Sequence, residues 1–281
     1  MDTQPAVLCK SPHPRIRVIE QFDLLGLLGA ALIGLALGLL GSGGSVLTVP
    51  VLVFLFQQEP KIAITGSLLV VGTIALIGAA LHARRQRPDL TILLLFAPTG
   101  MLGSWLGATA SATVSGAVQL QTLAAAMIVA AALMIRPPSS MQRAQTTEPP
   151  ARRPSTYFYL SLLGLGTGAL TGFVGVGGGF LIVPALVIGA ALPMHRAVAT
   201  SLVLISLNAY TGFWEQWSFH KSSVASLDLA TLGLVTAMGI AGLLVGERVA
   251  GRLSQTKLRQ IFGFLLVVLA ALLLWNSLQH H

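Results

Sequence analysis

GSGGSVLTVP at residues 41–50 and GVGGGFLIVP at residues 175–184 decide the fold of this chain. Each stretch lies between two apolar runs, and its tandem glycines are poor helix formers. We therefore expect the helix to break at each glycine cluster. A short helix that ends at a proline should follow each break.

The two glycine stretches belong to a longer internal repeat. Pro50 and Pro184 are 134 residues apart, and the same offset places Ser67 opposite Ser201. Farther along, Gly-x-x-x-Gly pairs match at an offset of 139, because the second half carries five extra residues in a polar loop. Symmetric halves of this kind are common in transporters. The chain is therefore predicted to consist of two related halves.

Composition assigns the chain to the membrane. Hydrophobic residues make up 54% of it and charged residues 9%, whereas soluble domains carry about 25% charged residues. A spanning helix needs about 20 apolar residues. Apolar runs lie at residues 22–40, 44–56, 62–81, 89–109, 117–135, 156–173, 178–192, 196–214, 228–246 and 258–275. The prediction is an all-α integral membrane protein with two inverted-topology repeats of about five transmembrane or broken helices each.

The charged loops predict how the repeats are arranged. The expected parts are a polar N-terminal tail at 1–20, a first repeat at 21–135, a linker at 136–155 and a second repeat at 156–276. With five crossings per repeat, twelve of the 17 Lys and Arg residues lie on one side with the linker. The positive-inside rule makes that side cytoplasmic. Nine crossings remain the alternative, because the basic N-terminal tail favours the cytoplasm.

The glycine clusters are the first candidates for a binding site. Broken backbone survives in a bilayer only where it is buried in protein or lines a cavity. A helix that follows a break presents free N–H groups and the positive end of its dipole, which favour an anion. Close helix packing and a tight turn are the alternative explanation. The candidate residues at the breaks are Gly43, Gly44, Ser45, Gly177, Gly178 and Gly179.

Small polar side chains in the apolar runs are the second set of candidates. Hydroxyl groups can donate to an anion without adding charge, although bonding to a carbonyl one turn back is the common alternative. A buried amide needs partners, so Asn208 is interpreted as a ligand or as a clamp between helices. The candidates are Thr65, Ser67, Thr200, Ser201 and Asn208.

Other motifs point to structure rather than chemistry. Glycines spaced four apart predict close helix contacts, and such pairs occur at Gly34/Gly38, Gly103/Gly107, Gly168/Gly172 and Gly242/Gly246. His82 and Gln216 lie at the ends of matched runs and are interpreted as anchors at the membrane interface.

Several function classes lack candidate residues. No acidic residue lies deep inside an apolar run, as a cation carrier or proton relay would require. There is no HExxH motif, no GxSxG motif and no Cys/His cluster, so we expect no enzyme, no metal and no cofactor. The basic residues lie in short loops, where they set orientation. They therefore do not indicate a nucleic-acid partner, and the lipid bilayer is the expected surrounding.

The glycine motifs also resemble a known family. GSGGSVLTVPVLVF at 41–54 and GVGGGFLIVPALVI at 175–188, each followed by an Ala-x-x-(Gly/Thr)-Ser-Leu segment, resemble the sulfite exporter TauE/SafE family. This resemblance covers residues 22–275. It implies a multi-pass permease of the bacterial inner membrane that carries sulfite, thiosulfate or a sulfonate, often outward, and it suggests a homodimer. Ser45 stands where the second half has Gly179, which leaves open whether both halves share the ligand equally.

These observations lead to one hypothesis and its rivals. The hypothesis is an alternating-access exporter that holds a small sulfur-containing anion near the midplane, between the two glycine-rich breaks. An inside-negative potential favours anion exit by about 2.3 kcal/mol per charge per 100 mV, so export needs no coupling ion. The rivals are an anion channel, a carrier of another small organic anion, and a membrane scaffold that transports nothing.

Overall fold

The structure is a computed structural model, and helices with short connections, but no strand, make up the part of the chain that it describes. It describes residues 24–41, 44–83, 88–135, 154–175, 179–186, 190, 192, 194–219 and 228–250, and single helical residues between 260 and 272. The helices are α2 (Leu24–Leu40), α3 (Gly44–Pro50), η1 (Val51–Leu55), α4 (Pro60–Ala83), α5 (Leu90–Ala112), α6 (Gly116–Ile135), α8 (Pro154–Val174), α9 (Gly179–Pro184), α10 (Met194–Phe219) and α12 (Leu229–Ala250). The predicted all-α fold is thus confirmed.

Both predicted helix breaks are present. Helix α2 ends at Leu40 before α3 begins at Gly44, and α8 ends at Val174 before α9 begins at Gly179. The expectation that proline ends the short helices is wrong for both, because α3 continues past Pro50 as the π-helix η1 and π-helical backbone also continues past Pro184 to Leu186. Proline lacks the N–H that would close the preceding turn, and a wider π turn accommodates that loss.

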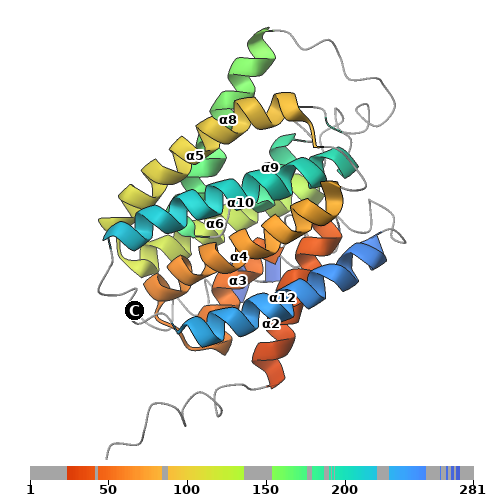
Figure 1. Cartoon of the computed structure of the whole chain (residues 1–281). Coiled ribbons are helices and arrows are strands. Elements are labelled where there is room, and N and C mark those ends of the chain that lie inside the picture. The colour runs from red at the N-terminus through yellow and green to blue at the C-terminus, as the bar shows by residue number, and fades with distance from the viewer. Residues whose placement is uncertain are drawn as a thin grey trace, which may run out of the picture.

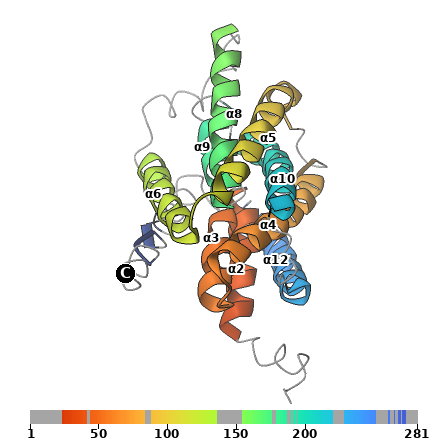
Figure 2. The ribbon, with the colours of Figure 1, turned by 90° about the vertical axis from the view of Figure 1, so that its left-hand side faces the viewer.

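The helices form three layers. Helices α5, α10, α4 and α12 succeed one another from top to bottom of the first layer (Figure 1) and pack in that order. Helices α8, α9, α3 and α2 form the middle layer, and α6 lies on its far side (Figure 2). The short helices that follow the two breaks therefore lie in the interior of the molecule.

The glycine pairs bring helices of the first and middle layers into backbone contact, as predicted. A Cβ built on Gly34 or Gly242 would overlap carbonyl oxygens of the facing helix in the α2–α12 pair. The same holds for Gly107 and Gly168 in the α5–α8 pair. Small residues permit this close approach, which drives helix association in a bilayer through van der Waals contact.

The first helix of each half of the chain packs against a helix of the other half. Helix α2, the first of its half, packs against α12, the fourth of the other half, and α8 packs against α5 in the matching way. The central pair is α4 and α10, which occupy the same position in the two repeats. The two repeats are thus intertwined by equivalent contacts, while their inversion across a bilayer stays a prediction.

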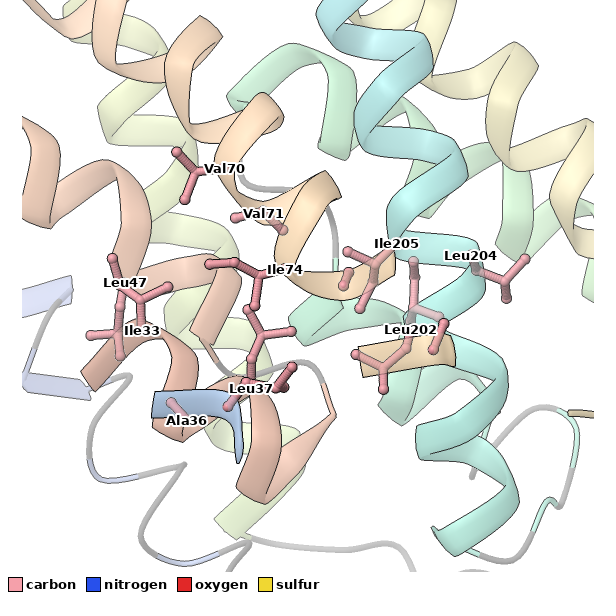
Figure 3. Close-up of a cluster of buried hydrophobic side chains, with 14 of the residues drawn as sticks. Ile33, Ala36, Leu37, Leu47, Val70, Val71, Ile74, Leu202, Leu204 and Ile205 are labelled. Carbon is pink, nitrogen blue, oxygen red and sulfur yellow. The ribbon is translucent and has the colours of Figure 1, made fainter. Parts of the chain in front are cut away.

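Burial separates a core from a lipid-facing surface. Of their apolar spans, 72% of α4 and 61% of α10 are buried inside the molecule, against 39% for both α5 and α12. Figure 3 shows the core around α4, where Ile74 meets Ile33 and Leu37 of α2. Large apolar side chains such as Leu94 and Phe158 are exposed by 76% and 75%. Apolar patches of this kind face lipid in a membrane protein.

Four of the described helices are long and apolar enough to cross a membrane: Pro60–Ala83, Leu90–Ala112, Arg196–Ser218 and Leu229–Val249. Further apolar helices in the described part are shorter, among them Leu24–Leu39 and Phe158–Val174. A full crossing takes about 20 residues. The chain is therefore a multi-pass membrane protein, and the choice between nine and ten crossings stays a prediction.

Candidate binding site at the two helix breaks

Each break begins with a glycine in the left-handed backbone conformation. Gly41 has φ +68° and Gly175 has φ +74°. The N–H of Gly41 donates to the carbonyl of Leu37 at 2.8 Å, and that of Gly175 donates to Thr171 at 2.9 Å. Glycine adopts this conformation without the steric penalty of a Cβ, and it commonly ends helices in this way. The chain can therefore turn sharply at the same point of each half.

A serine of the opposite half contacts each break. The hydroxyl of Ser201 of α10 lies 2.9 Å from the Val198 carbonyl of its own helix and 3.2 Å from the Gly41 carbonyl, so it shares its single proton between these two acceptors. Ser67 of α4 bonds in the same way to the carbonyls of Gly175 and Ile64. Ser67 and Ser201, which the repeat predicts to be equivalent, therefore make equivalent contacts. Each hydroxyl ties one half of the chain to the break in the other half.

The apolar neighbours of the serines close the two turns. A Cβ at Gly41 would overlap the side chain of Val198, and a Cβ at Gly175 would overlap that of Ile64. Val198 and Ile64 are 134 residues apart, which is the repeat offset. No side chain fits at either turn, so both glycines are required by contact as well as by conformation.

The two short helices meet behind these turns. Helix α3 contacts α9 and α4, while α9 also contacts α10. Figure 2 shows α3 and α9 between α6 and the layer of α4 and α10. Ser45 and Thr48 of α3 are fully buried. Thr48 donates to the carbonyl of Gly44 at 3.2 Å. The start of each short helix is therefore enclosed by protein.

The structure describes three of the six predicted residues of the breaks. Gly44, Ser45 and Gly179 are buried at the starts of the short helices, beside the helices that carry Ser67 and Ser201. A Cβ at Gly44 would overlap the carbonyl oxygen of Ile33, so Gly44 packs directly on α2. The predicted residues Gly43, Gly177 and Gly178 lie outside the described residues.

The serine hydroxyls do not present free protons in this arrangement. Both Ser67 and Ser201 direct their protons to backbone carbonyls. A hydroxyl group has one proton and can rotate. To donate to an anion, each hydroxyl must leave its carbonyl partner. Such a rotation would also release the contact between the two halves at that break.

Thr200 has a different role from its neighbour Ser201. Its hydroxyl oxygen accepts the backbone N–H of Asp89 at 3.1 Å. Asp89 is the N-cap of α5, and its carboxylate accepts the N–H of Ile92. Thr200 therefore holds the start of α5 against α10, and its hydroxyl group bonds to Asp89 rather than to a residue of the breaks.

Asn208 also lies apart from the breaks, two helical turns along α10 from Ser201. It is fully buried, and neither Oδ1 nor Nδ2 has a hydrogen-bond partner. The amide packs against Gly100 of α5, where a Cβ would lie 2.8 Å from Oδ1. An unsatisfied buried polar group costs about 1–3 kcal/mol. The amide of Asn208 therefore forms no side-chain hydrogen bond that would clamp two helices together.

Gln216 is a buried bridge rather than an interface anchor. Its side chain is 3% exposed. The Nε2 group donates to the carbonyl of Gly172 at 2.8 Å, and Oε1 accepts the hydroxyl proton of Thr65 at 2.8 Å. Its counterpart His82 lies 2.9 Å from Glu247 at the end of α12. Gln216 was interpreted as an interface anchor because it follows the end of an apolar run in the sequence. Helix α10 extends beyond that run to Phe219 and carries Gln216 into the interior.

Gln216→Leu is expected to lower the free energy of unfolding by about 1–3 kcal/mol, because it leaves the Gly172 carbonyl without its donor. Thr211→Val is the matched control, since Thr211 bonds only to the Leu207 carbonyl of its own helix among the contacts described. Thermal unfolding in detergent measures both variants. Equal melting temperatures would show that the bridge contributes nothing.

The described part of the site contains no buried charge. No Lys, Arg, Asp or Glu is buried among the residues whose exposure is described. The described residues also contain no group of three or more His, Cys, Asp or Glu side chains able to hold a metal ion. Any anion held at the breaks would therefore be solvated by backbone N–H groups and neutral side chains.

Comparisons with known proteins agree with this architecture. Residues 26–273 match the family model described as "Sulfite exporter TauE/SafE". A "Probable membrane transporter protein" of Xylella fastidiosa strain Temecula1 is 31% identical over 255 residues, which cover 88% of this chain and 92% of the relative. The "Probable membrane transporter protein YunE" of Bacillus subtilis is 28% identical over 275 residues, or 92% of this chain and 98% of the relative. No solved structure is significantly similar to the chain.

Proposed function

Because the chain belongs to the sulfite exporter TauE/SafE family, we propose that this membrane transporter exports a small sulfur oxyanion, sulfite or an organosulfonate, across the bacterial inner membrane. The binding site is proposed to lie at the two glycine-rich breaks. Its residues are Gly43, Gly44, Ser45, Ser67, Gly177, Gly178, Gly179 and Ser201. Thr200 and Asn208, which were predicted with them, lie on the same helix as Ser201 but contact α5.

One observation carries the location of the site. Each break is held by the serine of the opposite half, through the bonds from Ser67 to Gly175 and from Ser201 to Gly41. A solute that takes these serine protons would loosen both cross-links between the halves. Binding and a change in the relative position of the halves are then coupled, which is the requirement for alternating access.

The electrostatics suit an anion that is carried outward. With neutral groups around the breaks, the first N–H groups of the short helices supply the donors. Glycine allows the anion to approach those groups closely. The membrane potential then favours exit of a monoanion by about 2.3 kcal/mol at 100 mV. Export therefore proceeds without a coupling ion.

Sulfite efflux from proteoliposomes tests the proposal. The purified protein is expected to release loaded sulfite faster than protein-free liposomes. Ser67→Ala combined with Ser201→Ala is expected to weaken the apparent affinity about 100-fold or more, since each of the two hydrogen bonds to a charged group contributes about 1.5–3 kcal/mol and about 1.4 kcal/mol is a factor of ten.

Ser206→Ala is the matched control on α10. The described contact of Ser206 is its bond to the Val203 carbonyl of the same helix at 2.8 Å, and its side chain is 3% exposed. Its efflux should equal that of the unmodified protein. Equal release with and without protein would reject transport, and equal affinity of the double variant and Ser206→Ala would reject the serine site. Saturable counterflow would distinguish a carrier from a channel.

A further inference from the structure

The two halves differ in polarity at three matched core positions. The first half has Ile33 and Leu37 on α2 and Ile74 on α4. At the offset of 134, the second half has Thr167 and Thr171 on α8 and Asn208 on α10. Three apolar side chains of one half are thus replaced by three polar ones in the other.

The structure preserves the equivalence of these positions. Figure 3 shows Ile33, Leu37 and Ile74 side by side in the buried apolar cluster around α4. Ile74 also lies against Gly239 of α12, just as Asn208 lies against Gly100 of α5. Since α8 packs on α10, the two threonines occupy the places that correspond to Ile33 and Leu37. We call Thr167, Thr171 and Asn208 the polar patch.

The polar patch is buried, and only some of its hydrogen-bonding groups have partners. Its members are exposed by 8%, 1% and 0%, respectively. Thr167 donates to the carbonyl of Leu163 and Thr171 to that of Thr167, both at 2.8 Å. Their oxygens keep lone pairs that can accept. Asn208 adds two N–H donors and one acceptor, with no partner for either end of the amide. Buried polar groups in native proteins are normally paired, so an unpaired amide indicates a missing ligand or water.

We propose that the polar patch is the specificity contact of the transporter and selects a monoanion that carries a hydrogen-bond donor, such as bisulfite or a hydroxysulfonate. The proposal rests on the transport function proposed above. Asn208 donates to the oxygens of the anion, and the threonine and amide oxygens accept the proton of its hydroxyl group. In this structure the patch is closed, so α10 must move relative to α5 and α8 to admit the substrate.

Two physical arguments favour this class over dianions without a donor. Desolvation of an ion rises steeply with its charge, and no cation is buried in the described part of the molecule to offset it. Sulfate and thiosulfate also present only acceptors, so they can use the N–H donors of Asn208 but offer no proton to the acceptor oxygens of Thr167, Thr171 and the amide. A site that bonds a hydroxyl group of its ligand discriminates strongly against the analogue that lacks it.

Asn208→Ile, which installs the residue of the first half, tests the proposal. The probes are 2-hydroxyethanesulfonate and propanesulfonate, which are similar in size and differ in that the first has a hydroxyl group where the second has a methyl group. Binding of each probe to the detergent-solubilised protein is measured. The unmodified protein is expected to bind the hydroxysulfonate at least tenfold more tightly. In Asn208→Ile this preference should disappear, with less than a threefold change for propanesulfonate.

Stability separates this role from a structural one. Asn208→Ile should melt at the same temperature as the unmodified protein or higher, because it removes an unpaired buried amide. A lower melting temperature with an unchanged hydroxyl preference would overturn the proposal, and Thr211→Val should change neither quantity. If Asn208→Ile keeps the preference for the hydroxysulfonate while the unmodified protein shows normal efflux, the proposed role of the polar patch is refuted and the transport function is not. Absence of efflux of every sulfur anion refutes the transport function as well.

Discussion

Gly168→Ala is expected to destabilise the folded protein by about 3 kcal/mol, whereas Gly166→Ala, two residues away on α8, should leave its stability unchanged or slightly raised. A Cβ at Gly168 would overlap the carbonyl oxygen of Gly100 and lie 2.8 Å from its carbonyl carbon. These are backbone atoms, so the whole of α5 must shift to make room. Gly166 has no atom within 4 Å of its built Cβ.

The pair of variants isolates helix contact from helix propensity. Alanine is favoured over glycine in a helix interior by about 1 kcal/mol, and this gain applies to both positions. Thermal unfolding in detergent, with size-exclusion chromatography to follow the folded fraction, measures the difference. Equal melting temperatures for the two variants would mean that the α5–α8 backbone contact does not stabilise the protein. Gly34→Ala on α2 should repeat the Gly168→Ala result, because Gly34 faces the carbonyl of Gly239 in the same way.

Gly175→Ala is expected to reduce sulfite efflux to the level of protein-free liposomes. The left-handed conformation at φ +74° costs an L-residue about 1–2 kcal/mol. The added Cβ would also lie 2.7 Å from the carbonyl oxygen of Ile64 and overlap its side chain. Relief of this overlap moves the break away from α4, which separates the Gly175 carbonyl from Ser67.

Gly233→Ala is the control for this experiment, because nothing lies within 4 Å of its built Cβ. Gly41→Ala provides a milder second variant, since the neighbours of its built Cβ belong to the side chain of Val198. Efflux is compared at equal amounts of monodisperse protein. Efflux within twofold of the unmodified protein for both Gly175→Ala and Gly41→Ala would contradict a transport role for the breaks.

Some features could be predicted because their causes are local. Tandem glycines destabilise a helix wherever they occur, so both breaks were predicted from the sequence and are present. Apolar run length and the scarcity of charge predict a membrane protein without any knowledge of packing. The glycine pairs predict close contact for the same reason, since a bare backbone surface is a property of the helix itself.

Other features depend on contacts with distant segments of the chain, which the local sequence does not identify. The repeat placed Ser67 and Ser201 in matched positions, but not against the breaks of the opposite halves. Thr200 follows the same pattern of small hydroxyls, yet it contacts the start of α5. Gln216 lies near the end of an apolar run, yet it is a buried bridge to Gly172.

The sequence by itself determined the helices, their two breaks, the duplication and the membrane environment. Only the tertiary structure decided that α2 joins α12 and α8 joins α5, so that each half completes the other. The physical reason is that helix position and length follow from backbone propensity and bilayer thickness, which act within a single segment. The choice of partner follows from shape complementarity between distant segments, because lipid is as apolar as the helix surfaces and hydrophobicity does not distinguish one partner from another.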